Sequence, residues 1–175
     1  MSNNELFPIV DENGITIGKA TRQECHSGSM LLHPVVHLHI FDKSGKLYLQ
    51  KRSLNKDIQP GKWDTAVGGH VDFGETVEQA LLRETKEELS FTGFKPYPLF
   101  KYIFQSDRER ELVNAFFTIT DKTCFQFDHV ELDDGKFFSR QDIFQALGKN
   151  ILTPNFEKEY DMLLKTISQF PDILH

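Results

Sequence analysis

The sequence predicts one domain of the α/β or α+β class, in which short strands alternate with two or three helices. Three observations lead to this prediction. Short apolar runs recur between clusters of turn residues, as is typical of strands. Two longer segments, Val77–Leu89 and Thr153–Gln169, begin with helix-start signals. The length of 175 residues suits a single domain with a sizeable core.

The first half of the chain favours strands. A hairpin is expected over Phe7–Arg22, because two apolar runs flank turn residues at Asp11–Gly14. A second pair of strands is expected at Val35–Phe41 and Leu47–Arg52. A short apolar segment, Trp63–Gly68, then leads into a loop that we expect to begin at Gly69.

The second half contains the helices. Thr76 and Gln79 form a capping-box pattern ahead of Val77–Leu89, a segment without glycine or proline. Thr153 is the expected N-cap of the last helix, and Pro154 its first residue. Between them we expect strands at Leu99–Gln105 and Leu112–Thr120 on either side of a polar connector, Ser106–Glu111. A further strand is expected at Gly135–Ser139 and a helix over Ser139–Leu147, and Thr123–Leu132 favours neither structure.

Composition narrows the class of protein. A net charge of −6 argues against a general binder of nucleic-acid polymers. Cys25 and Cys124, the two cysteines, indicate no disulfide framework and suit a reducing compartment, so a cytoplasmic location is expected. No apolar run approaches the length of a membrane span, and the N-terminus lacks the pattern of a signal peptide.

The helix Val77–Leu89 carries an unusual group of carboxylates. Val77, Ala80 and Leu81 form its inward stripe, and Glu84 and Glu88 continue that stripe, with Glu87 at one edge. Like charges three and four residues apart repel, and carboxylates near a helix C-terminus oppose the helix dipole. A bound Mg²⁺ or Mn²⁺ would reverse these effects. The alternative is a solvated acidic face in which Arg83 is an i,i+4 partner.

Residues 69–91, GHVDFGETVEQALLRETKEELSF, also resemble the Nudix box, Gly-x5-Glu-x7-Arg-Glu-U-x-Glu-Glu-x-Gly-U, where U is a bulky apolar residue. The matching positions are Gly69, Glu75, Arg83, Glu84, Glu87, Glu88 and Phe91. Thr85 stands where an aliphatic residue is usual, and Ser90 where glycine is expected. The resemblance implies a single Nudix hydrolase domain over residues 1–175, with a mixed sheet sandwiched between helices and, by family expectation, a homodimer.

The resemblance further implies cleavage of a diphosphate bond in a small molecule. Glu84, Glu87 and Glu88 would hold Mg²⁺ or Mn²⁺, and Glu87 or Glu131 would be the general base, with neither preferred. Gly68 and Gly69 would let the backbone approach the substrate. The basic cluster of Lys51, Arg52 and Lys56 could hold the diphosphate, or it could be a solvated strand end.

The flanking sequence is similar to one branch of this superfamily, isopentenyl-diphosphate isomerase. The similarity covers roughly residues 5–120 and implies a second divalent site, made by His26, His33, His70, Glu109 and Glu111. Each histidine alone is more often a satisfied core or surface residue, and the set could be inherited without a metal.

Isomerase chemistry needs a cysteine directly before the Gly-His pair, and here that residue is Gly68. The isomerase also tends to lose the paired glutamates that this chain keeps. The sequence therefore favours a metal-dependent diphosphate hydrolase. The alternatives are an isopentenyl-diphosphate isomerase and a non-enzymatic domain that binds ligands, and no residue pattern specifies the substrate.

Overall fold

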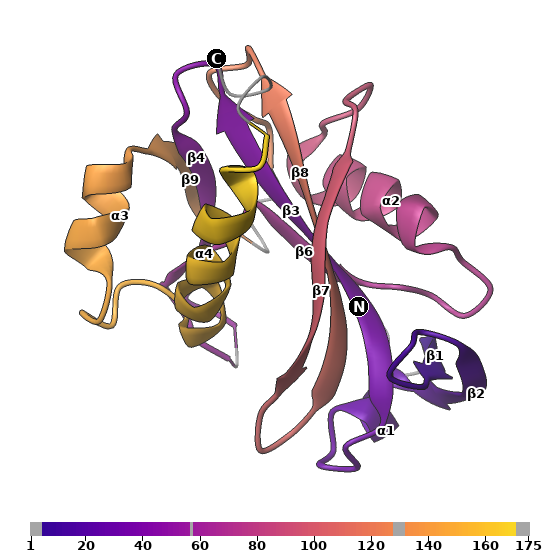
Figure 1. Cartoon of the computed structure of the whole chain (residues 1–175). Coiled ribbons are helices and arrows are strands. Elements are labelled where there is room, and N and C mark those ends of the chain that lie inside the picture. The colour runs from indigo at the N-terminus through magenta and orange to yellow at the C-terminus, as the bar shows by residue number, and fades with distance from the viewer. Residues whose placement is uncertain (1–4, 57, 128–131, 171–175) are drawn as a thin grey trace.

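A mixed β-sheet lies between two layers of helices. The computed structural model describes residues 5–56, 58–127 and 132–170. Helix α2 (Val77–Leu89) covers one face of the sheet, and helices α3 (Arg140–Ala146) and α4 (Pro154–Ile167) lie on the other side (Figure 1). The predicted fold class is therefore confirmed.

The central strand of this sheet is β3 (Leu32–Asp42), which is longer than the predicted strand. Along one edge it pairs in parallel with β8 (Arg110–Thr120) over its whole length. Along its other edge it pairs first with β6 (Val67–His70) and then with β4 (Leu47–Arg52), both antiparallel. β3 therefore brings residues from three distant segments side by side.

The outer strands complete the sheet. β5 (Trp63–Asp64) and β9 (Leu132–Phe138) pair with β4, and β7 (Tyr97–Gln105) pairs with β8. β7 begins before the predicted boundary and includes Pro98, next to an irregularity in its ladder. Proline is tolerated there because β7 lies at the edge of the described sheet, where one side of the strand needs no donors.

Helix α2 begins and ends with local signals. Thr76 and Gln79 form the predicted capping box. Ser90 occupies the left-handed C-cap with φ of 48°, a conformation that glycine adopts more readily. Thr85 is buried, and its hydroxyl donates to the carbonyl of Leu81 at 2.6 Å. The two departures from the box pattern therefore fall on capping and packing positions.

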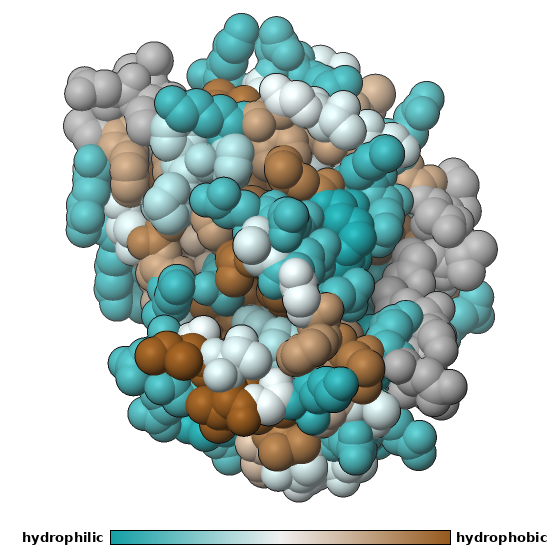
Figure 2. Space-filling model, turned by 90° about the vertical axis from the view of Figure 1, so that its right-hand side faces the viewer, coloured by the Kyte–Doolittle hydropathy of each residue, from teal (hydrophilic) through white to brown (hydrophobic). Residues whose placement is uncertain are grey.

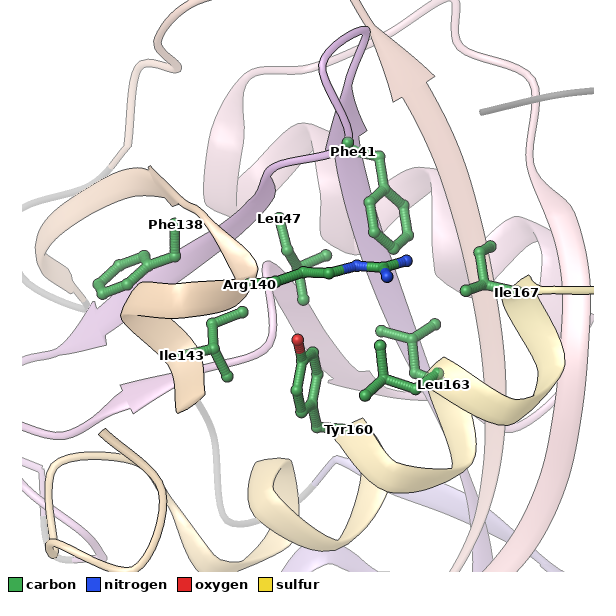
Figure 3. Close-up of a pocket in the computed structure, with 10 residues that line it drawn as sticks. Phe41, Leu47, Phe138, Arg140, Ile143, Tyr160, Leu163 and Ile167 are labelled. Carbon is green, nitrogen blue, oxygen red and sulfur yellow. The ribbon is translucent and has the colours of Figure 1, made fainter. Parts of the chain in front are cut away.

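Alternating residues of β3 face two separate cores. Val36 and Leu38 pack toward α2, where Leu81 is fully buried. The opposite core contains Phe41 with Leu163 of α4. Figure 3 shows a small pocket in this second core, with the side chain of Arg140 extending across it. None of the predicted site residues lines this pocket, so we interpret it as a packing gap between α3, α4 and the sheet.

The N-terminal hairpin forms a separate two-stranded sheet. Its strands are β1 (Leu6–Val10) and β2 (Thr16–Thr21), as predicted, and a short helix α1 (Arg22–Cys25) follows that the sequence reasoning missed. The hairpin exposes Ile15 and Ile17. Figure 2 views the molecule from the right-hand side of Figure 1, where the hairpin lies, and shows hydrophobic residues gathered in the lower part of this face.

The predicted boundaries next to two candidate site residues, Gly69 and Glu111, were wrong. Gly69 does not begin a loop, because it lies within β6 and pairs with Val36 of β3. Arg110 and Glu111 belong to β8 rather than to the polar connector, because they pair with Leu32 and His33. Of the segment that favoured neither structure, residues 128–131 lie outside the described part of the chain.

Candidate functional site

Arg83 of α2 joins the box loop, the helix and the sheet. Its Nε and Nη2 donate to the two carboxylate oxygens of Glu75, at 3.0 and 2.9 Å. Its Nη1 donates to Glu84 at 2.8 Å and to Glu87 at 3.3 Å. Nη2 also donates to the backbone carbonyl of His70 at 2.9 Å. One guanidinium therefore orients three carboxylates against the end of β6.

The contact with Arg83 has different effects on the pKa values of Glu84 and Glu75. Burial raises the pKa of Glu84, and the Arg83 contact opposes that rise. For Glu75 the contact outweighs burial, so its pKa is lowered. The charge of Glu87 raises the pKa of Glu84 further. Glu84 is thus a partly buried carboxylate crowded by other acids, and a cation would relieve this crowding.

The two glycines of β6 face opposite sides of the sheet. A Cβ on Gly69 would overlap the side chain of Glu84. A Cβ on Gly68 would instead meet the ring of His37, at 3.5 Å from its Cδ2. Gly69 is therefore required because Glu84 occupies the space of a side chain.

A cluster of imidazoles lies on the other face of the sheet. His26 caps α1, His33 lies on β3 and His70 on β6, and their potential ligand atoms all lie within 4.8 Å of one another. Nε2 of His26 is 3.1 Å from Nε2 of His70. Among the described residues the glutamates of α2 form no such group, since Arg83 holds Glu84 and Glu87.

Hydrogen bonds leave the Nε2 atoms of this cluster turned inward. Nδ1 of His33 lies 2.9 Å from the carbonyl of Leu31, so it carries the hydrogen and Nε2 keeps its lone pair. That Nε2 is buried and has no hydrogen-bond partner within the described parts of the chain. Nδ1 of His26 lies 3.2 Å from Glu109. This arrangement is typical of metal-ligating histidines.

The two carboxylates near the cluster differ in position. Glu111 lies 3.9 Å from Nε2 of His70, on the side of the potential ligand atoms. Glu109 lies behind His26, against its Nδ1. Burial and the charge of Glu109 raise the pKa of Glu111 to about 7.

The hairpin covers the cluster and keeps it neutral. The ring of Phe7 stacks on His70 at a centroid distance of 4.4 Å, and Phe7 is fully buried. Burial lowers the pKa of His26 to about 4 and also lowers the pKa values of His33 and His70. Neutral imidazole is the form that binds metal.

The predicted phosphate-binding residues Arg52 and Lys56 lie at the end of β4 and just after it. Nε of Arg52 donates to the carbonyl of Ile58 at 3.1 Å, and its Nη1 lies 3.6 Å from Asp64. Arg52 thus helps to hold the loop after β4, and Lys56 lies within that loop. Glu131 lies outside the described residues.

The sequence reasoning missed a buried polar network between α4 and the sheet. Glu159 of α4 contacts His37 and His39 of β3 and Tyr102 of β7. One signal was available: Glu159 lies on the apolar stripe of the last helix, three residues after Phe156. Its partners are more than 50 residues away, so no local pattern identifies them.

A sequence profile of the NUDIX domain matches residues 31–158, which is most of the chain. The chain belongs to the Nudix family. An uncharacterised Nudix hydrolase of Streptomyces coelicolor is 33% identical over 119 residues, covering 67% of this chain and 65% of the relative. An isopentenyl-diphosphate Delta-isomerase of Streptomyces griseus is 39% identical over 87 residues, covering 50% of this chain and 44% of the isomerase.

A solved structure from Deinococcus radiodurans shares the fold, with a TM-score of 0.76 and 23% identity over 89% of this chain and 96% of that one. The chain spans about half to two thirds of the length of the two curated relatives, 44% and 65%. The resemblance to the Nudix family and to its isomerase branch is therefore confirmed. No helix in the described residues is long and apolar enough to cross a lipid bilayer.

Proposed function

We propose that this Nudix protein hydrolyses a diphosphate bond in a nucleoside-diphosphate-X or related small molecule, with Mg²⁺ or Mn²⁺ as cofactor. The observation that carries the proposal is the clamp of Arg83 on Glu75, Glu84 and Glu87. These contacts support a metal site in the box, because they hold the three carboxylates in place beside the end of β6. Such crowding near a helix C-terminus is unfavourable unless a cation binds there.

Glu84, Glu87 and Glu88 would hold the cation, because carboxylate oxygens are the ligands that Mg²⁺ prefers. When bound, it would polarise the diphosphate and lower the pKa of the attacking water. The water oxygen would bond to one phosphorus as the bridging P–O bond breaks, giving a monophosphate and X-phosphate. Arg83 would keep the acidic side chains oriented and would not contact the substrate.

The attacking water must also lose a proton to a base. Glu87 and Glu131 are the two candidates. The side chain of Glu87 is 59% exposed, which supports its access to a bound substrate. Gly68, Arg52 and Lys56 are the proposed contacts to the substrate diphosphate.

The imidazole cluster would hold a second cation through Nε2 of His26, His33 and His70, with Glu111 as a further ligand. The buried Nε2 of His33 supports this proposal, since it has no other partner in the described residues. Mixed imidazole and carboxylate ligands suit Mn²⁺ or another transition metal. Glu109 would act through His26, by orienting its ring.

We further propose that residues 1–175 form a single Nudix domain, that it is cytoplasmic, and that it acts on a small molecule rather than on a nucleic-acid polymer or a membrane. A homodimer is proposed from the family alone.

A second candidate function is isomerisation of isopentenyl diphosphate. The cluster of His26, His33 and His70 favours it, as does the similarity to a named isomerase. Gly68 argues against it, because it stands where the isomerase resemblance requires a cysteine. Formation of dimethylallyl diphosphate by the wild-type protein would overturn the hydrolase proposal.

The test is a panel of diphosphates that includes nucleotide sugars, dinucleotides, coenzyme A and prenyl diphosphates, each with Mg²⁺ and with Mn²⁺. Monophosphate products would be measured through a coupled phosphatase. We expect turnover of at least one compound. Glu84→Gln should lower the rate by about 100-fold or more, since it removes the charge of a proposed cation ligand and losing one such electrostatic group typically costs that much. No turnover of any compound would support a ligand-binding domain instead.

The second site is tested separately by metal content. We expect Mn²⁺ to co-purify or titrate with wild type and to be lost in His33→Ala, while His39→Gln, outside the cluster, retains it. Equal metal binding by both variants would contradict the imidazole site.

A further inference from the structure

An open groove lies where the box loop, residues 71–76, meets the start of α2. Its volume is about 410 Å³, within the range of small-molecule sites, and its lining residues are Asp72, Phe73, Gly74, Glu75, Gln79 and Arg83. The loop passes beside the N-terminal hairpin (Figure 1), and the backbone N–H of Phe73 donates to the carbonyl of Leu6 at 2.8 Å. A Cβ on Gly74 would have no atom of the described residues within 4 Å, so there is room for a ligand above the loop.

Phe73 presents an aromatic ring to this groove. The residue is 47% exposed, although a large apolar side chain gains free energy by burial. Its position is held by the backbone contact with Leu6 and by Lys19 of β2, whose Nζ lies 5.2 Å from the centre of the ring. A ring that is both fixed and exposed is a surface on which a planar ligand can stack.

Two polar groups of the groove keep hydrogen-bonding capacity. Oε1 of Gln79 accepts from the backbone N–H of Thr76 at 2.9 Å, and the amide nitrogen of Gln79 has no acceptor within the described parts of the chain. The side chain of Asp72 is 50% exposed, and its carboxylate lies 3.7 Å from Nη2 of Arg83, which is too long for a hydrogen bond. The groove therefore offers one donor and one acceptor beside the ring of Phe73.

Arg83 forms a wall of the groove without offering a donor to a ligand. Its Nε and Nη2 donate to Glu75, and Nη2 also donates to the carbonyl of His70. Its Nη1 donates to Glu84 and to Glu87. All five N–H groups of the guanidinium are thus committed, so recognition in the groove depends on the other side chains.

The groove leads along α2 toward the proposed cation site. Gln79, Arg83 and Glu87 follow one another at intervals of four residues, so they form a row on one side of the helix. The axial distance from Gln79 to Glu87 is about 12 Å, from the rise of an α-helix. A nucleotide covers this span, with its diphosphate at Glu87, its ribose beside Arg83 and its base in the groove.

We propose that this groove binds the base of a nucleoside diphosphate compound, and that the base carries an exocyclic amino group, as in adenosine, guanosine or cytidine. The inference rests on the proposed diphosphate hydrolysis. The base stacks on Phe73, its amino group donates to Asp72, and the amide N–H of Gln79 donates to a ring nitrogen or carbonyl of the base. Uracil lacks the amino group, and prenyl diphosphates lack the planar ring, so the groove discriminates against both.

The binding test uses three compounds in which a methylene bridge prevents hydrolysis: the α,β-methylene diphosphates of adenosine and of uridine, and methylenediphosphonate, which has no base. Affinities would be measured by calorimetry with Mg²⁺ present. We expect the adenosine compound to bind about tenfold or more tightly than methylenediphosphonate, because of base stacking. It should also bind about tenfold more tightly than the uridine compound, which leaves Asp72 unpaired. Equal affinity of the adenosine compound and either of the others would overturn the inference.

Three variants assign these differences to residues. Phe73→Leu keeps the apolar bulk but removes the aromatic ring, and Phe144→Leu, at a 76% exposed residue of α3, is the matched control. We expect Phe73→Leu to weaken binding of the adenosine compound about tenfold and to leave methylenediphosphonate unaffected, while Phe144→Leu changes neither. Asp72→Asn should bring the adenosine and uridine compounds to similar affinities, because an amide can donate to the uracil carbonyl. Equal affinities in Phe73→Leu and Phe144→Leu, or an unchanged base preference in Asp72→Asn, would contradict the proposal.

The contact can also be observed in the wild-type protein, without relying on the folding of a variant. Nuclear Overhauser effects are expected between protons of the adenine ring and ring protons of Phe73, and their absence at saturation would rule out the stacking. These measurements are independent of turnover. The proposed hydrolysis can therefore fail in the diphosphate panel while the base is still shown to bind, and hydrolysis without any base preference would overturn the groove alone.

Discussion

Replacing Gly69 by alanine is the sharpest perturbation of the box that this structure offers. The added methyl group would overlap Cγ, Cδ and Oε1 of Glu84, so the carboxylate has to leave its position. Arg83 then loses the contact of 2.8 Å that its Nη1 makes with Glu84, but keeps Glu75 and the carbonyl of His70. The fold should therefore survive while the proposed metal ligand is displaced.

The expected magnitudes follow from these contacts. Overpacking a well-packed position costs about 1–3 kcal/mol. In a domain of this size that corresponds to a fall of roughly 2–12 °C in Tm. Displacing a catalytic group by about 1 Å can cost a factor of about 100 in rate, so kcat/KM should fall at least that far.

The assay combines turnover of the compound selected from the diphosphate panel, Mg²⁺ titration of the rate, and thermal unfolding. Gly18→Ala is the matched control: Gly18 is an exposed strand residue, and its added Cβ would lie 3.9 Å from Ile9. Wild-type turnover and Mg²⁺ dependence in Gly69→Ala would refute the reasoning, because Glu84 would then be dispensable as a ligand. Loss of folding in both variants would show that the damage is not specific to Glu84.

Three further predictions concern single side chains. Glu87→Gln should lower kcat by about 100-fold with Tm nearly unchanged. The control is Glu78→Gln, on the exposed first turn of α2, which should leave turnover as it is. Equal turnover rates in these two variants would contradict the role of Glu87. Arg83→Lys should lower both turnover and Tm, because a single ammonium cannot reach Glu75, Glu84 and the carbonyl of His70 at once. Full activity of this variant would contradict the proposed role of Arg83. Glu159→Gln should destabilise the fold by about 3–5 kcal/mol near pH 5.5, since it leaves a buried charge unpaired. The pKa of Glu159 in the folded protein lies below its ordinary value of 4.5, so the stability that its charge contributes is present above pH 4.5. The pKa of His37 in the folded protein is raised from 6.5 to about 9, so the stability that its charge contributes is lost as pH rises from 6.5 through 9. The Tm difference from wild type should thus shrink by pH 9, and a constant difference would contradict the ion pair.

Much of the local structure could be predicted because its causes are local. Thr76 and Gln79 lie three residues apart and together satisfy the first turn of α2. Thr153 and Pro154 start α4 in the same way. The short helix α1 was missed although Thr21 and Glu24 form a capping box, because four residues are too few to show a helical period.

Strand boundaries could be predicted less well, because pairing with distant partners decides them. Glu111 read as part of a polar connector, but pairing with His33 extends β8 through it. Gly69 was predicted to begin a loop from local sequence alone. Its pairing with Val36 of β3 instead keeps it in β6. The propensity of a residue for a strand depends on its neighbours in the sheet more than on its own identity.

The sequence by itself determined the fold class, the box helix with its row of carboxylates, and the histidines that come together as a cluster. These follow from composition, spacing and capping, which act over a few residues, and from the resemblance of the box. Only the tertiary structure decided that Glu109 lies behind His26 while Glu111 faces the cluster. It alone joined His37 to Glu159 across 122 residues, because a buried charge finds its partner through the packing of α4 on the sheet and not through any pattern along the chain.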